Sequence, residues 1–349
     1  MRRKIFALLA VCAVVLGTAS VGFAVPKDDK KAKNTNQLLA LLPPSDGAMT
    51  VDAKRFFGEA LPQILSANQP LLTEILGKFD EIKAKTGIDL KQFHQVAIGV
   101  NAVKVAEKQY NFEPLVLARG QYNAAGLVSV AKIASNGKYR EEKIGDKTVY
   151  VFSVKEIIEQ NKAKITNSLV TKILDKIMAG LNSELALTAY DSNTLALGSL
   201  ARVREVFETK TRLSGEVLNL VSRKPNAIIS FGAKVPNGLS QFIELDNDEL
   251  GNNLDAIRFL SGSMDVLDGN TMVSFSAKTV NAEQAKGLKD TFDGLQTLGK
   301  ALLSSSKSPE KKVYGRIVES AKIAQAGNEV TIDLQVPQAD LNVIVGAKK

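Results

Sequence analysis

The segment from Asp246 to Asp255, DNDELGNNLD, carries the densest group of oxygen-bearing side chains in the chain. Calcium takes oxygen ligands, and Asp246, Asp248 and Gly251 stand where an EF-hand loop has its first two ligands and its glycine. An apolar residue occupies a further ligand position, however, and Ile257 stands where the loop needs its bidentate Glu. We interpret the segment as a solvated loop or helix start, which leaves Asp246, Asp248 and Asp255 as the residues to test for calcium.

His94 is the single histidine, so a Ser-His-Asp or Cys-His catalyst must use it or do without. No Gly-x-Ser-x-Gly elbow occurs, and no partner motif accompanies Phe93-His94-Gln95, which favours a structural histidine. One His and one Cys are too few for a structural zinc site. These counts predict a non-enzymatic protein without a cofactor, although a hydrolase that uses paired carboxylates or a Ser-Lys pair stays open.

A phosphate-binding loop is nearly matched by Gly294–Ala301, GLQTLGKA. Ala301 replaces the Ser or Thr whose hydroxyl would hold magnesium. The context also differs, because an apolar stripe at helical spacing passes through the segment and predicts one long amphipathic helix. The members of this stripe are Ala285, Leu288, Phe292, Leu295 and Leu302. The amides of the segment would then bond within the helix, which argues against a nucleotide site.

The strongest predicted helix covers 155–181 and has lysines opposite an apolar ridge. Its basic and apolar positions are Lys162, Lys164, Ile165, Leu169, Lys172, Ile173, Lys176 and Ile177. Such a helix could cover a hydrophobic groove or lie on an anionic membrane. A helix that packs on a sheet needs the same stripe, and this is the interpretation that we favour.

The first residues have the pattern of a secretory signal peptide. Basic residues precede the apolar run Ile5–Leu16, and the small residues Gly22 and Ala24 precede Val25. The apolar run is too short for a transmembrane helix, which needs about 20 residues. Cys12 lies inside this run rather than at its end, which argues against a lipoprotein. We expect residues 1–24 to be removed on export and the mature protein to be periplasmic or extracellular.

Export would change the composition of the chain. Cys12, the single cysteine, leaves with the signal peptide, so the mature protein must fold without disulfides by burying a sizeable core. Three cations leave as well, which reduces a formal net charge of +8 to a mild basic excess. Without Trp and with few Tyr, this excess does not indicate a nucleic-acid partner. The charged residues 25–37 that follow are expected to be a disordered tether.

Hydrophobic periodicity and turn residues predict alternating strands and helices. Strands are expected at 48–51, 95–100, 114–118 and 227–231, and hairpins at 139–154, 184–198 and 260–278, with a last hairpin that turns at Gly327-Asn328. Helices are expected at 72–82, 124–134, 155–181, 200–210 and 285–302, and a polar loop at 304–312.

Two stretches of nearly equal length, Pro44–Val154 and Pro225–Val336, share the order strand, helix, strand, strand, helix, strand. This is the order of the split βαβ, or ferredoxin-like, arrangement, although an α+β chain can also give it by chance. The predicted fold class is α+β, with two tandem ferredoxin-like (βαββαβ) units, antiparallel sheets and packed amphipathic helices. We expect a first domain at 38–221, with a helix-hairpin-helix elaboration from about 155, and a second domain at 222–349.

The openings Leu41-Leu42-Pro43-Pro44-Ser45-Asp46 and Lys85-Thr86-Gly87-Ile88-Asp89 resemble those of uncharacterised exported bacterial proteins built from repeated α+β units. The resemblance implies no activity and no functional residues. We therefore expect a non-enzymatic binding or structural protein, whose partner is an unknown protein or an apolar ligand, with weak anionic-membrane contact as a further possibility. A carrier of a lipid or other apolar ligand is the first alternative, and a hydrolase the second.

Overall fold

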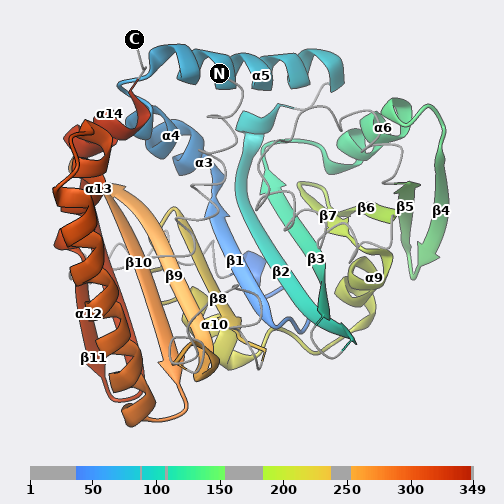
Figure 1. Cartoon of the computed structure of the whole chain (residues 1–349). Coiled ribbons are helices and arrows are strands. Elements are labelled where there is room, and N and C mark those ends of the chain that lie inside the picture. The colour runs from blue at the N-terminus through green and yellow to red at the C-terminus, as the bar shows by residue number, and fades with distance from the viewer. Residues whose placement is uncertain (1–36, 87–88, 107–108, 154–183, 237–252, 347–349) are drawn as a thin grey trace. The chain divides into compact units, whose positions relative to one another are not determined.

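The computed structural model describes residues 37–86, 89–106, 109–153, 184–236 and 253–346 (Figure 1). They form two compact units. The described residues of unit 1 are those up to Arg55 and those within Thr73–Leu218. Unit 2 comprises Phe56–Leu72 and the described residues from Asn219 onward. The predicted signal peptide and the predicted helix at 155–181 lie outside the described residues, and the predicted domain boundaries stay predictions.

Unit 1 consists of an antiparallel sheet with helices. Its elements are β1 (Gly47–Asp52), α3 (Ala53–Arg55), most of α5 (Gln69–Thr86), η2 (Leu90–Gln92), β2 (Phe93–Ala106), β3 (Gln109–Gly120), α6 (Ala124–Ala134), β4 (Tyr139–Ile144), β5 (Lys147–Ser153), β6 (Glu184–Asp191), β7 (Thr194–Gly198) and α9 (Leu200–Glu208). The strands lie in the order β1-β2-β3-β7-β6-β5-β4. Gly145, at φ 59°, forms the predicted β4–β5 turn, because glycine adopts this left-handed conformation without strain.

Unit 2 likewise consists of antiparallel strands with helices. Its elements are η1 (Phe56–Ala60), α4 (Leu61–Ile64), the end of α10 (Gly215–Val221), β8 (Ile229–Lys234), β9 (Ile257–Leu267), β10 (Asn270–Thr279), α12 (Ala282–Ser304), α13 (Pro309–Ser320), β11 (Lys322–Ala326), β12 (Glu329–Pro337) and α14 (Gln338–Val345). The strands lie in the order β8-β9-β10-β12-β11. The hairpins predicted at 260–278 and at Gly327 are confirmed, with Gly269 and Gly327 at positive φ in their turns.

The strands of the two units follow the same path. In each, the first strand pairs antiparallel with the second, the second and third form a hairpin, and a helix then leads to strands that return in reverse order. The last strand of each path, β7 or β12, thereby lies beside the third strand, β3 or β10.

The ferredoxin-like arrangement is not found, although the α+β class is. In a split βαβ unit, the two strands joined by a helix run parallel with another strand between them. Here the helical connection after β1 brings the chain back to the end that it left, since Asp52 pairs with Gln95 at the start of β2. The predicted order of elements agrees with the described residues of unit 1, whereas the observed strand pairing does not have the split βαβ pattern.

Most predicted helices begin at a capping residue. Asn123 caps α6, which has the predicted bounds, Ser199 caps α9 and Asn281 caps α12, each by accepting a backbone N–H with its side-chain oxygen. Residues 304–312 are not the expected loop, because Pro309 starts α13, where its fixed φ suits a first turn. Among the described residues, no helix is long and apolar enough to span a membrane.

Candidate functional site

Two adjacent rows of residues, most of which carry a hydroxyl group, run across four strands of unit 2. In the first row, Ser230, Ser263, Ser274 and Asp333 lie opposite one another on β8, β9, β10 and β12. In the second row, the corresponding residues are Gly232, Ser261, Ser276 and Thr331. Because side chains two residues apart on a strand share a face, both rows lie on the same face of the sheet. We call these eight residues the serine lattice.

Four serines of the lattice are buried although they are polar, and Ser274, Thr331 and Asp333 are partly buried. Ser230, Ser261, Ser263 and Ser276 are all buried. Ser230 Oγ donates to the Lys224 carbonyl oxygen at 3.3 Å, and the Ser276 hydroxyl contacts Arg223 and Glu329. Within the described part of the chain, the hydroxyls of Ser261 and Ser263 have no such partner. Neither hydroxyl is fully enclosed, and both serines line a pocket, so their hydroxyls are available to water or to a polar ligand.

The apolar core of unit 2 lies on the other face of the sheet. Phe275 and Ala277 alternate with the serines of β10, and they belong to a cluster that includes Leu288 of α12. Figure 1 shows α12 running beside β11. This cluster is therefore built without the lattice, and the serines take no part in packing α12 on the sheet.

A cavity of about 330 Å³ lies over the lattice. The end of α10 forms one side, where Leu220 approaches Gly232 so closely that a Cβ on this glycine would lie 2.5 Å from Leu220 Cβ. The two residues Arg223 and Lys224, just after α10, line the same cavity. A volume of this size is at the lower end of the range for small-molecule sites.

Charge at the cavity is positive on one side. The Arg223 guanidinium pairs with Glu329 and donates to Ser276 Oγ at 3.1 Å. Burial raises the pKa of the Glu329 carboxyl, but hydrogen bonds from Arg223 and Ser276 and the charge of Arg223 outweigh it, so the pKa lies below the ordinary value of 4.5. Lys224 has no carboxylate partner in the described residues. The cavity thus offers one cation that is already paired and one that is free to pair with a ligand.

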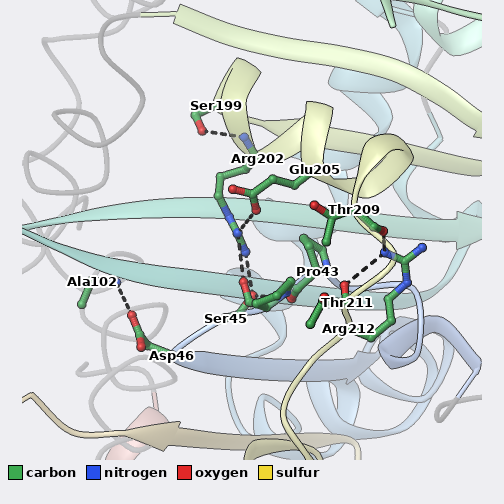
Figure 2. A network of polar contacts seen from close by, with 11 residues as sticks. Pro43, Ser45, Asp46, Ala102, Ser199, Arg202, Glu205, Thr209, Thr211 and Arg212 are labelled. Carbon is green, nitrogen blue, oxygen red and sulfur yellow. Dashed lines mark hydrogen bonds and ion pairs between the residues drawn. The ribbon is translucent and has the colours of Figure 1, made fainter. Parts of the chain in front are cut away.

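A second polar network lies in unit 1 around Arg202 of α9 (Figure 2). The Arg202 side chain is 0% exposed, and it donates to Pro44 O at 3.0 Å and to Ser45 Oγ at 2.6 Å. It also pairs with Glu205. With its amide oriented to satisfy both neighbours, Asn101 accepts from Arg202 at 3.0 Å and donates to Pro44 O at 3.2 Å. Burial lowers the pKa of the Arg202 guanidinium, and the charge of Glu205 acts in the opposite direction.

The Arg202 network shows what the polar groups of the segment Leu41–Asp46 contact. This segment is one of the two that carry the resemblance noted in the sequence. Ser45 and Pro44 supply the acceptors, while the Asp46 carboxylate accepts from the Ala102 amide at 2.9 Å (Figure 2). Gly99 leaves the space that Ser45 occupies, since a Cβ there would lie 2.6 Å from Ser45 Oγ. Because the enclosed Arg202 side chain bonds to Pro44 and Ser45, this network acts as an anchor between α9 and the chain before β1.

The residues predicted as sites are only partly described. Asp246, Asp248 and the basic helix with Lys162, Lys164, Ile165, Leu169, Lys172, Ile173, Lys176 and Ile177 lie outside the described residues. Asp255 is described and already has a partner. In the described ranges, no group of three or more His, Cys, Asp or Glu residues could hold a metal ion. His94 lies in β2, at an irregularity of its pairing with β3.

The serine lattice was missed, although the sequence contains a signal for it. Ser261-Gly-Ser263 and Ser274-Phe-Ser276 flank the predicted turn at Asp268-Gly269-Asn270. A two-residue turn at Asp268-Gly269 sets a register in which Ser263 faces Ser274 and Ser261 faces Ser276. Arg202 was also missed, and its place on the buried face of α9 beside Val203 and Val206 is its weak sequence signal.

No family model matches the chain, and no curated protein matches it closely enough to indicate a relative. Solved structures of TP0453 are similar in outline. Crystal form I has a TM-score of 0.43 and 11% sequence identity, and the match covers 88% of this chain and 96% of that one. Crystal form IV has a TM-score of 0.44 and 7% identity, with 90% and 99% covered. Nothing about function is inferred from a likeness at this level.

Proposed function

We propose that the chain is a non-enzymatic binding protein whose serine lattice holds a small hydroxylated ligand with one negatively charged group. The observation that carries the proposal is the pair of buried hydroxyl rows, which the core does not need and which lie beside Arg223 and Lys224. The expected export of the protein would place this binding outside the cytoplasm, in the periplasm or the extracellular space.

The hydroxyl rows match the chemistry of a polyol. A serine or threonine hydroxyl donates one hydrogen bond and accepts two, so neighbouring serines can satisfy the hydroxyls of a sugar or similar ligand in either sense. Ser261 and Ser263 supply such groups from one strand, and Ser274 supplies another from the strand beside it. The cavity of about 330 Å³ suits a ligand of the size of one sugar ring.

The cations favour a ligand that carries an anion. Lys224 is available for a phosphate or carboxylate, and Arg223 could add a second contact if its pair with Glu329 opened. The wall also includes Asp333, which would accept ligand hydroxyls. An apolar ligand would leave these charges and hydroxyls without partners, which disfavours the lipid-carrier alternative at this cavity.

Hydrolysis by a Ser-Lys pair is also disfavoured at this cavity. Within the described residues, the serine that contacts Lys224 is Ser230, and its hydroxyl donates to the Lys224 backbone oxygen. A nucleophile instead needs a base within hydrogen-bond reach of its own proton. The arrangement therefore supports binding without turnover.

Isothermal titration with a small panel tests the proposal. D-Glucose 6-phosphate and D-glucuronate combine hydroxyls with an anion, whereas D-glucose and inorganic phosphate each have one of the two features. We expect the first two to bind measurably and the last two to bind at least tenfold more weakly. Lys224→Ala should weaken binding of D-glucose 6-phosphate at least tenfold, and Lys210→Ala, which removes an exposed lysine of unit 1, should not. Equal binding by both variants, or no binding of any panel member, would contradict the proposal.

A further inference from the structure

Helix α12 continues well beyond the apolar core that its first half covers. Ala285 and Leu288 are fully buried in the core of unit 2, with Phe292 packed against the same cluster. The helix runs on to Ser304, and at 1.5 Å per residue this second half adds about 15 Å. The second half contacts α13 instead of the core, through Gly299 beside Val318.

The apolar stripe of α12 also continues, but it is uncovered there. Leu295 is 48% exposed, Leu298 is 60% exposed and Leu302 is 73% exposed. Their spacing of three and four residues places them on one side of the helix. Exposed leucines in a row on one helix face are unusual unless the face meets a partner.

Cations follow this stripe directly. Lys307 lies in the turn after α12, and Lys311 and Lys312 lie in the first turn of α13. All three are exposed, and none has an ion-pair partner in the part of the chain that the structure describes. The lysines along α12 differ, because Lys286 pairs with Asp290 and Lys300 pairs with Glu319.

The lysines of α13 are not explained by helix stability. The first turn of a helix carries a partial positive charge, which disfavours cations such as Lys311 and Lys312 there. Three unpaired cations at the end of an exposed leucine stripe form the pattern by which a helix lies on a negatively charged bilayer, with leucines in the acyl boundary and lysines at the headgroups.

We propose that the end of the α12–α13 hairpin, comprising Leu295, Leu298, Leu302, Lys307, Lys311 and Lys312, docks on an anionic lipid bilayer. This proposal does not depend on the serine lattice, which lies on the face of the sheet opposite to the one that α12 covers. It places membrane contact at residues other than those of the basic helix predicted from the sequence.

Vesicle sedimentation of the purified full-length protein tests the proposal. The parent should sediment with vesicles of phosphatidylcholine and phosphatidylglycerol, and far less with phosphatidylcholine alone. Lys311→Glu/Lys312→Glu should reduce binding to the anionic vesicles at least tenfold, because each cation near such a surface contributes substantially. Leu298→Ser/Leu302→Ser should reduce it comparably.

Matched controls separate docking from general charge and folding. Lys54→Glu/Lys210→Glu changes the net charge equally at exposed positions of unit 1, and Leu267→Ser removes an apolar residue that is 54% exposed elsewhere. Both controls should bind vesicles like the parent. Equal loss in controls and test variants would overturn the proposal. So would a dimer in analytical ultracentrifugation that Leu298→Ser/Leu302→Ser abolishes while vesicle binding is unchanged, because a second copy would then cover the stripe.

Discussion

The strands of the two units follow the same path but carry different side-chain chemistry at equivalent positions. The first four strands along the path of unit 2 carry the serine lattice. The equivalent two rows of unit 1 contain Thr50, Ala97, Leu117 and Ala196, and Ala48, Gly99, Leu115 and Gly198. Ala97, Leu115, Leu117 and Ala196 are fully buried. One path thus supports an apolar interior in unit 1 and a polar cavity in unit 2.

The arginines of the two regions show the same contrast. Arg202 is enclosed in unit 1 and held by Pro44, Ser45 and Glu205. Arg223 is 39% exposed in its side chain and lies at the rim of a cavity. A buried cation with fixed partners stabilises one conformation, whereas the Arg223 guanidinium would reach a ligand if its pair with Glu329 opened. The proposed function accordingly assigns a stabilising role to Arg202 in unit 1 and a binding role to the cavity beside Arg223 in unit 2.

The largest expected effect is the loss of the Arg202 anchor. Arg202→Ala should lower the free energy of unfolding by about 2 to 4 kcal/mol, because it leaves a cavity and unpaired acceptors on Pro44 and Ser45. Urea denaturation followed by circular dichroism measures this. Arg204→Ala is the matched control two residues along α9, where an exposed arginine pairs with Glu142 and Glu208 and should matter by less than about 1 kcal/mol. Equal effects of the two substitutions would remove the contrast between the regions.

Two single serine substitutions, one in each unit, test the same comparison with smaller expected changes in stability. Ser45→Ala should cost about 1 kcal/mol of stability, since the Arg202 guanidinium loses an acceptor. Ser263→Ala should be neutral or slightly stabilising in the free protein, because its hydroxyl has no partner in the described residues. The same Ser263→Ala change should weaken binding of D-glucose 6-phosphate in titration calorimetry. A Ser263→Ala variant that is destabilised and binds normally would assign the lattice to structure.

The smallest expected effect is a pH dependence at Glu329. Its folded pKa lies below the ordinary 4.5, so it contributes stability above pH 4.5 that is lost as the pH falls through the folded pKa. The stability difference between the parent and Glu329→Gln should therefore be constant near neutral pH and shrink below pH 4.5. Urea denaturation at several pH values measures it, and a difference that grows on acidification would contradict the assigned direction.

Local structure was largely predictable from the sequence, whereas strand pairing was not. The turn residues Gly145, Gly269 and Gly327 each specify a hairpin locally, and Asn123 and Ser199 mark helix starts. Parallel and antiparallel strand pairs can both have the order strand, helix, strand. Hydrophobic periodicity does not indicate at which end of the first strand the second strand begins. This is why the ferredoxin-like arrangement was expected and not found.

The candidate site was partly visible in the sequence. The alternation of Ser261 and Ser263 and of Ser274 and Ser276 around a tight turn already puts four hydroxyls on one face. Alternating polar residues are typical of a solvated sheet face, however, and only the burial of these serines distinguishes a cavity from such a surface. Arg223 contacts Ser276, which lies more than 50 residues further along the chain, and no local sequence pattern predicts this contact.

The most direct measurement is a titration of D-glucose 6-phosphate into the ¹⁵N-labelled, deuterated protein, followed by amide chemical shifts. The proposal predicts saturable shifts that cluster at Arg223, Lys224, Ser230 and the two Ser-x-Ser segments, and that are lost in Lys224→Ala. Shifts that cluster around Arg202 would contradict a binding site at the serine lattice. So would shifts that are scattered over both units and increase linearly with ligand concentration without saturating.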